Sequence, residues 1–333
     1  MWTIVRTSVK EFLTPWQVFL IINASSHVLD EPKMTHVLTL VASQGNPQVS
    51  DSHFREAAKI LAHYNVEQDG KRLWLDKGKA GEISIYGGPQ SALIAHLRDF
   101  FAKDKIDFFI TAANNRQKKL LLADMDSTIA STETLDELAD YAGIKDKIAA
   151  ITAQAMEGKL DFKAALRERV GLLKDLPVKA LKETLEKTTL NPGAESFAPT
   201  MKAQGATCVL VSGGFTFFTE AIAARSGFEV HHGNILEIDN EKLTGQVREP
   251  ILDKFAKVDF LERHMQEKNL KPEDCLTIGD GANDVPMLKK AGLGIGYHPK
   301  KTVLEEVHNA IIYGDLTAAL YAQGYSSKYF KTL

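Results

Sequence analysis

Two carboxylates separated by a single residue, Asp124 and Asp126, follow the apolar run Leu121–Ala123 and precede the hydroxyl pair Ser127–Thr128. If the apolar run is a strand, Asp124 lies at its end, where open α/β sheets bind their ligands. A carboxylate in that position can attack phosphorus and become an aspartyl-phosphate, with Asp126 near enough to donate and accept a proton. Aspartate pairs also occur in solvated loops, so the rest of the chain has to decide between these interpretations.

A second apolar run, Val209–Val211, ends in Ser212 and is followed by Gly213 and Gly214. The glycines let backbone N–H groups approach an anion, and the Ser212 hydroxyl can donate to a phosphate oxygen. The same residues would also make a simple strand-to-helix turn. The pattern is therefore compatible with a phosphate-binding turn but does not by itself require one.

A third run, Thr277–Gly279, leads into Asp280, and Asp284 follows a glycine-rich turn. Hard oxygen ligands of this kind suit Mg²⁺, and the turn lacks the longer ligand spacing of a calcium-binding EF-hand. A basic side chain is also expected, to neutralise the phosphoryl oxygens. Lys257 and Lys254, near the start of the preceding helical stretch, compete for that role, and their spacing does not choose between them.

These residues need strands whose carboxyl ends meet at one edge of a sheet. Strand patterns from residue 206 onward alternate with helical ones, which predicts an α/β fold with a doubly wound parallel sheet. Between residues 133 and 187 the pattern is helical throughout, which predicts a cap inserted between the first two strands of that sheet. The strands expected after the cap cover residues 206–211, 230–238, 242–248, 275–278, 293–297 and 310–313.

The segment from about residue 33 to residue 113 is patterned as strand, helix, strand, strand, helix, strand, which is the split βαβ arrangement. It is similar to the small ACT-like domains that sense ligands in amino-acid enzymes, but a dimerising or purely structural role is equally compatible. The expected strands cover residues 34–42, 72–75, 82–86 and 106–111, and the expected helices cover 51–64 and 90–102. The predicted domains are residues 1–113, a catalytic core of 114–132 with 190–333, and a cap of 133–189.

The composition is that of an ordinary globular protein, with 333 residues, 44% of them hydrophobic and 25% charged. A net charge of −3 implies no large basic surface, so no nucleic-acid partner is expected.

The apolar stretch Trp16–Ile22 is too short to span a bilayer and lacks a cleavage signal, so neither membrane insertion nor export is expected. Cys208 and Cys275 lie in apolar runs, which predicts buried, reduced thiols and suits a cytoplasmic protein. His231–His232 has no metal-ligand spacing, and a structural role is expected.

The combined pattern resembles the haloacid dehalogenase superfamily of phosphotransferases. The segment Asp124–Thr128 matches the first motif of that superfamily, Ser212 the second, Lys257 the third, and Gly279–Asp280 with Asp284 the fourth. The likeness runs from about residue 118 to about residue 320, and it is closer to the phosphoserine phosphatases than to the superfamily at large. Met125 stands where phenylalanine is frequent, and this change should not affect the chemistry.

This resemblance implies hydrolysis of O-phospho-L-serine to L-serine and phosphate, which is the last step of serine biosynthesis. It makes Asp124 the nucleophile and Asp126 the general acid and base. It also implies a Mg²⁺ ion held by Asp124, Asp280 and the backbone carbonyl of Asp126. The residues implied in substrate binding are Ser212, Gly213, Lys257 and Asn283 for the phosphoryl oxygens, Glu133 for the ammonium group and Arg169 for the carboxylate.

The helical pattern of the cap gives Arg169 separate support. With about 100° per residue, Arg169 falls inside the apolar stripe of Phe162, Ala165, Leu166 and Leu173, whereas Arg167 faces solvent. An arginine among apolar neighbours needs a partner, and a substrate carboxylate held by both prongs of the guanidinium would be one. The alternatives are an ion pair with Glu157 or Glu168, and for Glu133 a mere helix-dipole preference.

Other functions share these motifs. The chain could hydrolyse another small phosphomonoester, such as phosphothreonine or a sugar phosphate, or it could pass the phosphoryl group to another alcohol. A serine-sensing protein with a vestigial site is the alternative of a different class, and the intact set of Asp124, Asp126, Lys257 and Asp280 argues against it. A homodimer and an amino-acid effector bound by the N-terminal domain are further expectations.

Overall fold

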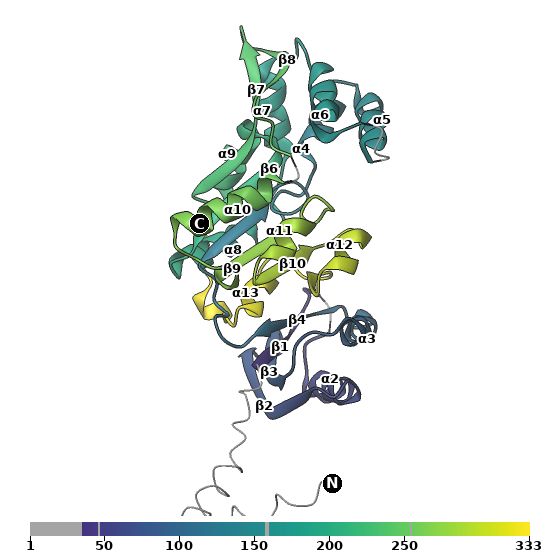
Figure 1. Cartoon of the computed structure of the whole chain (residues 1–333), viewed down its shortest axis with the longest axis vertical. Coiled ribbons are helices and arrows are strands. Elements are labelled where there is room, and N and C mark those ends of the chain that lie inside the picture. Colours follow the sequence, from purple (N-terminus) through teal and green to yellow (C-terminus); the bar gives the residue numbers. More distant parts are fainter. Residues whose placement is uncertain (1–34, 46, 157–159, 254) are drawn as a thin grey trace, which may run out of the picture. The chain divides into compact units, whose positions relative to one another are not determined.

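The computed structural model describes residues 35–333 except residues 46, 157–159 and 254, and Thr35–Leu333 forms one compact unit. Its N-terminal part is an antiparallel sheet in the order β2-β3-β1-β4, with two helices packed on one face (Figure 1). This arrangement confirms the predicted βαββαβ order. The elements are β1 (Thr35–Ala42), α2 (Asp51–His63), β2 (Glu67–Asp76), β3 (Ala80–Tyr86), α3 (Ser91–Ala102) and β4 (Ile106–Ala112).

The predicted catalytic core, called the catalytic part below, contains a seven-stranded sheet in the order β11-β10-β9-β5-β6-β7-β8, parallel except for the last pair. The strands are β5 (Leu120–Asp124), β6 (Thr207–Phe215), β7 (Val230–Asp239), β8 (Lys242–Arg248), β9 (Cys275–Gly279), β10 (Leu293–Tyr297) and β11 (Asn309–Ile311). The intervening helices are α8 (Ala194–Ala203), α9 (Thr216–Ser226), α10 (Ala256–Glu267), α11 (Val285–Lys290), α12 (Lys301–Glu306) and α13 (Ala318–Ala322). The doubly wound parallel sheet predicted from the sequence is therefore confirmed.

Strand β5 lies in the middle of this sheet, with β6 on one side and β9 on the other. The chain builds outward from β5 through β6 and β7, and then returns to the opposite side of β5 to form β9. This reversal of strand order creates the crevice at the carboxyl ends of the strands where such sheets bind ligands. All five residues of β5 are buried, as a strand covered on both faces requires.

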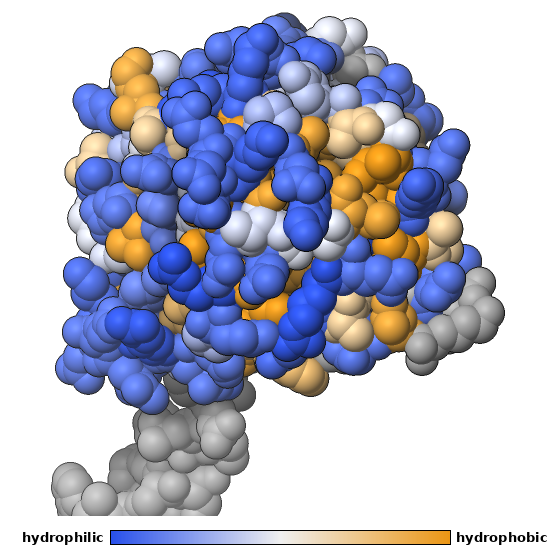
Figure 2. Space-filling model, turned by 90° about the horizontal axis from the view of Figure 1, so that it is seen from above, coloured by the Kyte–Doolittle hydropathy of each residue, from blue (hydrophilic) through white to orange (hydrophobic). Residues whose placement is uncertain are grey.

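Of the five helices between β5 and β6, the first four form the cap and the fifth is α8. The cap helices are α4 (Thr134–Tyr141), α5 (Lys145–Met156), α6 (Phe162–Gly171) and α7 (Val178–Lys187). The β7–β8 hairpin supports this cap, because the N–H groups of Asp175 and Val178 donate to the carbonyls of Leu243 and Glu241. Viewed from the hairpin end, the surface is mostly hydrophilic, with hydrophobic residues gathered in patches between the polar ones (Figure 2). The helices fall within residues 133–189, but the division into separate domains stays a prediction, because Thr35–Leu333 forms one compact unit.

The N-terminal sheet and the catalytic sheet meet at their edges, where β4 lies beside β11. The side chain of Asn309 bridges them: its Oδ1 accepts the Ile110 N–H at 2.9 Å, and its Nδ2 donates to the Ile110 carbonyl. The buried carboxylate of Asp107 accepts the N–H groups of Ile312 at 2.8 Å and of Gly314 at 2.7 Å. Arg98 of α3 donates to carbonyls at the end of α12. Polar side chains thus replace a continuous strand ladder at this joint.

The second face of the N-terminal sheet packs against the catalytic part. Val41 of β1 and Phe109 of β4 belong to the same hydrophobic cluster as Tyr321 and Ala322 of α13. Arg116 pairs with Glu82 of β3 at 2.8 Å and also donates to the Ala322 carbonyl. Both faces of the small sheet are therefore covered within one chain.

No helix in residues 35–333, the gaps excepted, is long and apolar enough to cross a membrane. Cys208 and Cys275 are both buried free thiols, as predicted. The His231 ring contacts Thr219, and the His232 ring stacks on Phe260 and contacts His264, which are packing contacts of the kind expected. The expectation for Trp16–Ile22 falls outside the described residues.

Candidate active site

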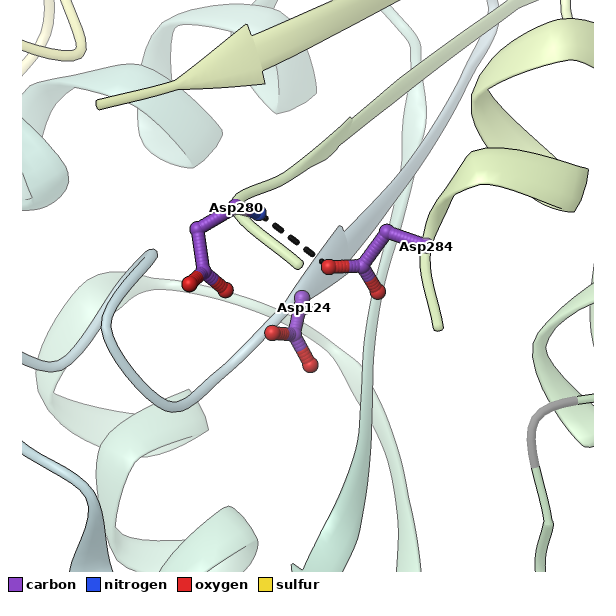
Figure 3. A group of neighbouring side chains, drawn as sticks. All are labelled: Asp124, Asp280 and Asp284. Atoms are coloured by element: carbon purple, nitrogen blue, oxygen red, sulfur yellow. Dashed lines mark hydrogen bonds between the residues drawn. The ribbon is translucent and has the colours of Figure 1, made fainter. Parts of the chain in front are cut away.

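Three buried carboxylates meet at the carboxyl ends of β5 and β9. Asp124 is the last residue of β5, Asp280 directly follows β9, and Asp284 precedes the first residue of α11. Oxygens from the three side chains all lie within 4.8 Å of one another, and Figure 3 shows the three converging on one point. The convergence follows from the sheet, because β5 and β9 pair in parallel and so end together.

Asp284 holds the turn that positions Asp280. Its Oδ2 accepts the backbone N–H groups of Asp280 at 3.1 Å and Gly281 at 3.0 Å, and the first of these bonds is drawn in Figure 3. The carboxylate packs so tightly against the end of β9 that a Cβ on Gly279 would lie 2.5 Å from it. Glycine is therefore required at this position, because any side chain would displace Asp284.

Lys257, in the first turn of α10, lies between two of these carboxylates. Its Nζ is 2.5 Å from Asp124 Oδ1 and 2.5 Å from Asp284 Oδ1, and the side chain is buried. Burial alone would lower the pKa of Lys257, but the two carboxylates raise it above its ordinary value, so the ammonium form is held firmly. The structure thus brings Lys257 to the site, whereas Lys254, its competitor in the sequence, lies outside the described residues.

Asp126 points to the opposite side of the crevice, toward the cap. Its Oδ1 accepts the N–H of Thr134 at the start of α4, and its Oδ2 accepts the hydroxyl of Ser212 at 2.9 Å. Ser212 in turn accepts the N–H of Gly214 at 2.8 Å. Burial raises the pKa of the Asp126 carboxyl, and the Thr134 N–H opposes that shift. A carboxyl with a raised pKa is suited to delivering a proton to a leaving oxygen.

Burial also raises the pKa values of Asp124 and Asp280. For Asp124 the nearby Asp284 raises the pKa further, while Lys257 lowers it. For Asp280 the main opposing influence is the ammonium group of Lys300, which lies 3.1 Å from its Oδ2. Each buried carboxylate therefore favours a neighbouring positive charge, which is the condition for binding a cation.

Glu133 and Arg169 face the same cavity from the cap. The Ser127 hydroxyl donates to Glu133 Oε1 at 2.7 Å, and burial followed by the charge of Asp126 raises the pKa of Glu133. Among the described residues, no carboxylate lies within ion-pair distance of the half-buried Arg169 guanidinium, so the alternative pairing with Glu168 is absent there. Glu157 lies outside the described residues. Arg167, by contrast, faces solvent and pairs with Glu249 at 2.5 Å.

The cavity between core and cap has a volume of about 830 Å³. The sequence-predicted residues on its lining are Asp124, Asp126, Glu133, Arg169, Ser212, Gly213, Asp280 and Asn283. Among the described lining residues are six carboxylates and three basic side chains, so the cavity is acidic. An acidic cluster of hard oxygen donors fits a Mg²⁺ ion, with Asp124 and Asp280 as the side-chain ligands facing the cavity.

Three residues of this site have contacts that the sequence pattern does not predict. Asp284 was recognised as part of a motif, but its contact with Lys257 joins residues 27 positions apart and has no local signature. Lys300 was indistinguishable from any solvated lysine. Ser127 has a positive φ of 56°, which is uncommon for a residue with a side chain, and only the structure reveals it.

A doubly wound sheet with a helical cap and with an aspartate pair, a serine, a lysine and a second acidic turn at its strand ends defines a class of phosphoryl-transfer hydrolases. The family model of haloacid dehalogenase-like hydrolases matches residues 121–289, which is half of the chain. The chain belongs to this family, which confirms the resemblance inferred from its motifs.

Within that family, several of the similar proteins are phosphoserine phosphatases. The chain is 40% identical over 198 residues to that of Archaeoglobus fulgidus, covering 60% of this chain and 57% of the relative. It is 33% identical over 288 residues to that of Streptomyces coelicolor, covering 86% of this chain and 70% of the relative. A solved phospho-aspartyl intermediate analogue of phosphoserine phosphatase is 39% identical and superimposes with a TM-score of 0.57, over 62% of this chain and 98% of that one.

Proposed function

We propose that this protein hydrolyses O-phospho-L-serine to L-serine and phosphate. One observation carries the proposal: a single cavity holds the aspartate pair on its core side and the Glu133 and Arg169 side chains on its cap side. The core groups suit a phosphoryl group, and the cap groups suit an ammonium and a carboxylate. The similarity to phosphoserine phosphatases, one of them solved as a phospho-aspartyl intermediate analogue, supports the same substrate. In metabolism the reaction would complete serine biosynthesis.

The proposed chemistry runs through Asp124. Its carboxylate attacks phosphorus in line with the departing serine oxygen, and the resulting aspartyl-phosphate is the covalent intermediate. Asp126 protonates the serine oxygen as it leaves and then takes a proton from the water that hydrolyses the intermediate. Lys257, Ser212, Asn283 and the N–H of Gly213 stabilise the charge that develops on the equatorial oxygens.

Dependence on Mg²⁺ is part of the proposal. The residues that would hold the ion are Asp124, Asp280 and the backbone carbonyl of Asp126, with Asp284 securing Asp280 and Lys257 from behind. A bound Mg²⁺ supplies Lewis-acid neutralisation of the phosphoryl oxygens. The three clustered carboxylates support this choice of a hard divalent cation.

The cap would select the substrate and exclude bulk water. Arg169 would bind the serine carboxylate through two parallel N–H···O hydrogen bonds from its guanidinium group, and Glu133 would bind the ammonium group. Ion pairs between α6 and the core, Lys163 with Asp253 and Arg167 with Glu249, support a cap that can seat against the cavity and part from it. Because the first pair is partly exposed and the second is exposed, each contributes little and can break readily.

Three further proposals concern the setting of the enzyme. A cytoplasmic location is supported by the two free, buried cysteines. A homodimer and an amino-acid effector at the N-terminal part are supported by its ACT-like strand order. The substrate proposed here is a small molecule, and nothing in the net charge of −3 favours nucleic acid.

The test is phosphate release from L-phosphoserine beside phosphothreonine, sugar phosphates and p-nitrophenyl phosphate, each with Mg²⁺ and with EDTA. We expect strong preference for L-phosphoserine, loss of activity in EDTA, and no turnover by Asp124→Asn. Equal rates on all substrates would be compatible with the aspartyl-phosphate mechanism but would refute L-phosphoserine as the preferred substrate. Near-native turnover by Asp124→Asn would refute the nucleophile.

A further inference from the structure

Lys300 is a lysine at the mouth of the cavity that none of the motifs includes. It follows β10 and immediately precedes α12, and its backbone N–H donates to the carbonyl of Asp280 at 3.0 Å. Its Nζ also lies 3.1 Å from Asp280 Oδ2, while 60% of the side chain is exposed. The lysine is therefore tethered to Asp280 at two points, but its ammonium group remains in contact with solvent.

The charge on the cavity lining gives this position its importance. Of the three basic lining residues, Lys163 and Arg169 both come from α6 of the cap, and Lys163 pairs with Asp253 at 3.5 Å. Lys300 is the basic residue that the described core contributes to the lining, because Lys257 is buried beneath Asp124. A phosphate dianion entering this acidic cavity is repelled unless a cation meets it at the mouth.

We infer that Lys300 admits the phosphate group of the substrate and, with the same ammonium group, restrains Asp280. The two effects have opposite consequences for the two ligands of the site. Positive charge at the mouth favours the phosphate, whereas an ammonium group on Asp280 Oδ2 competes with a divalent cation for that carboxylate. Lys300 thus raises the affinity of the site for phosphate and lowers its affinity for the metal. The inference rests on the proposed function, because it assumes a phosphate substrate and a divalent cation.

Lys301 supplies a matched control. It is the next residue in the sequence and carries the same charge, but its side chain is 88% exposed and its nearest carboxylate is Glu305, at 3.8 Å. Removing either lysine changes the net charge equally. An effect that depends on net charge alone would therefore be the same in Lys300→Ala and Lys301→Ala.

The experiment is isothermal titration calorimetry on the full chain, without turnover. Mg²⁺ is titrated into wild type, Lys300→Ala and Lys301→Ala, and inorganic phosphate is then titrated at saturating Mg²⁺. We expect Lys300→Ala to bind Mg²⁺ roughly three- to tenfold more tightly and phosphate roughly three- to tenfold more weakly, as removal of a screened charge at this distance predicts. Lys301→Ala should stay within about twofold of wild type in both, and Lys300→Arg should restore phosphate binding.

If either dissociation constant of Lys300→Ala stays within about twofold of wild type, or both change as in Lys301→Ala, the inference is overturned. Lys300→Gln removes the charge while keeping a side chain of similar length, and the melting temperatures of all variants detect misfolding. Misfolding is a minor concern because the Lys300 side chain is exposed. The calorimetry also separates this inference from the proposed function. Absence of phosphoserine turnover in wild type would refute the function while leaving the comparison of Mg²⁺ and phosphate affinities intact.

Discussion

At the scale of single residues, the proposed carboxylate clamp of Arg169 would distinguish an amino-acid phosphate from other phosphomonoesters. Arg169→Ala should raise KM for L-phosphoserine by roughly 10- to 100-fold, because charged hydrogen bonds of this kind are worth about 1.5–3 kcal/mol. KM for p-nitrophenyl phosphate, which has no carboxylate, should not change. Arg167→Ala removes the same charge from the solvent face of the same helix and should leave both constants unchanged. Equal losses on both substrates in Arg169→Ala would exclude the carboxylate clamp.

Ser127 combines backbone strain with a hydrogen bond to Glu133, the residue proposed to bind the substrate ammonium group. Its φ of 56° is better tolerated by glycine, but glycine lacks the hydroxyl that donates to Glu133. Ser127→Gly should keep the stability within about 1 kcal/mol of wild type, since relief of strain offsets the added freedom of the unfolded chain. It should raise KM for phosphoserine about fivefold, the value of one ordinary hydrogen bond.

Steady-state kinetics and urea denaturation would check this prediction, with Ser127→Ala as the companion variant. Alanine loses the hydroxyl but keeps the strained backbone, so it should match Ser127→Gly in KM and be the less stable of the two. A wild-type KM in both variants would mean that Ser127 does not position Glu133.

At the residue scale, the sequence identified the groups that line the cavity, and it identified Asp284 and Lys257 behind them without the contact that joins these two side chains. Asp124, Asp126, Ser212 and Asp280 each follow an apolar run, so their positions can be predicted from strand ends alone. Spacing did not choose between Lys257 and Lys254, and the choice of Lys257 came from the family resemblance. Its contact with Asp284 depends on how α10 packs against the sheet. Motifs report what touches the ligand, whereas supporting contacts depend on tertiary packing.

At the scale of secondary-structure elements, Arg98 of α3 secures the end of α12. Its guanidinium donates to the carbonyls of Leu304, Val307 and His308, which satisfies groups that a helix end leaves unpaired. Arg98→Ala should lower the free energy of unfolding by about 1–3 kcal/mol, because these carbonyls lose a charged donor. Urea denaturation measures the change, and Arg55→Ala, an exposed arginine of α2, is the control. Identical midpoints for the two variants would show that Arg98 contributes nothing to the joint.

Periodic apolar patterns made most elements predictable. Most strands of the catalytic sheet agree with expectation to within a few residues and the cap is helical as expected, because buried faces repeat with a fixed period. Two strands differ more: β6 was expected over residues 206–211 and extends over Thr207–Phe215, and β2 was expected over residues 72–75 and extends over Glu67–Asp76. The first seven residues of β2 are exposed and mostly polar, so they carry no apolar alternation from which a strand could be predicted.

At the scale of the whole molecule, Asp107 links stability to pH. Burial raises its pKa to about 6, although the N–H groups of Ile312 and Gly314 oppose the shift. The folded protein then keeps this proton up to about pH 6, whereas the unfolded chain releases it near pH 4. The stability that Asp107 contributes is thus fully present below pH 4 and is lost as the pH rises through 6, by about 3 kcal/mol at most.

Urea denaturation of wild type and Asp107→Asn at pH 4.5 and pH 7.5 checks this sign. From pH 4.5 to pH 7.5 we expect the free energy of unfolding of wild type to fall relative to that of Asp107→Asn, because asparagine does not titrate. Asp99→Asn, at an exposed position of α3, should track wild type at both. If the difference in free energy of unfolding between wild type and Asp107→Asn were the same at both pH values, the prediction would be contradicted.

The joint between the two sheets could not be predicted at this scale. Asn309 and Ile110 are 199 positions apart, and Arg116 reaches the Ala322 carbonyl across 206 positions. Local periodicity contains no information about such pairs. It indicated two folded parts and left open how they are joined.

The meeting of β4 with β11 has a consequence for the solubility of each half. An unpaired strand edge is a template for aggregation, and proteins usually blunt it with charges, prolines or bulges. Here each sheet blocks the edge of the other, with Asn309 and Asp107 as the contacts. A fragment cut between residues 113 and 114 would expose β4 in one piece and β11 in the other. Each part of the chain thus protects its neighbour from self-association, and the two are expected to stay soluble only while they remain joined.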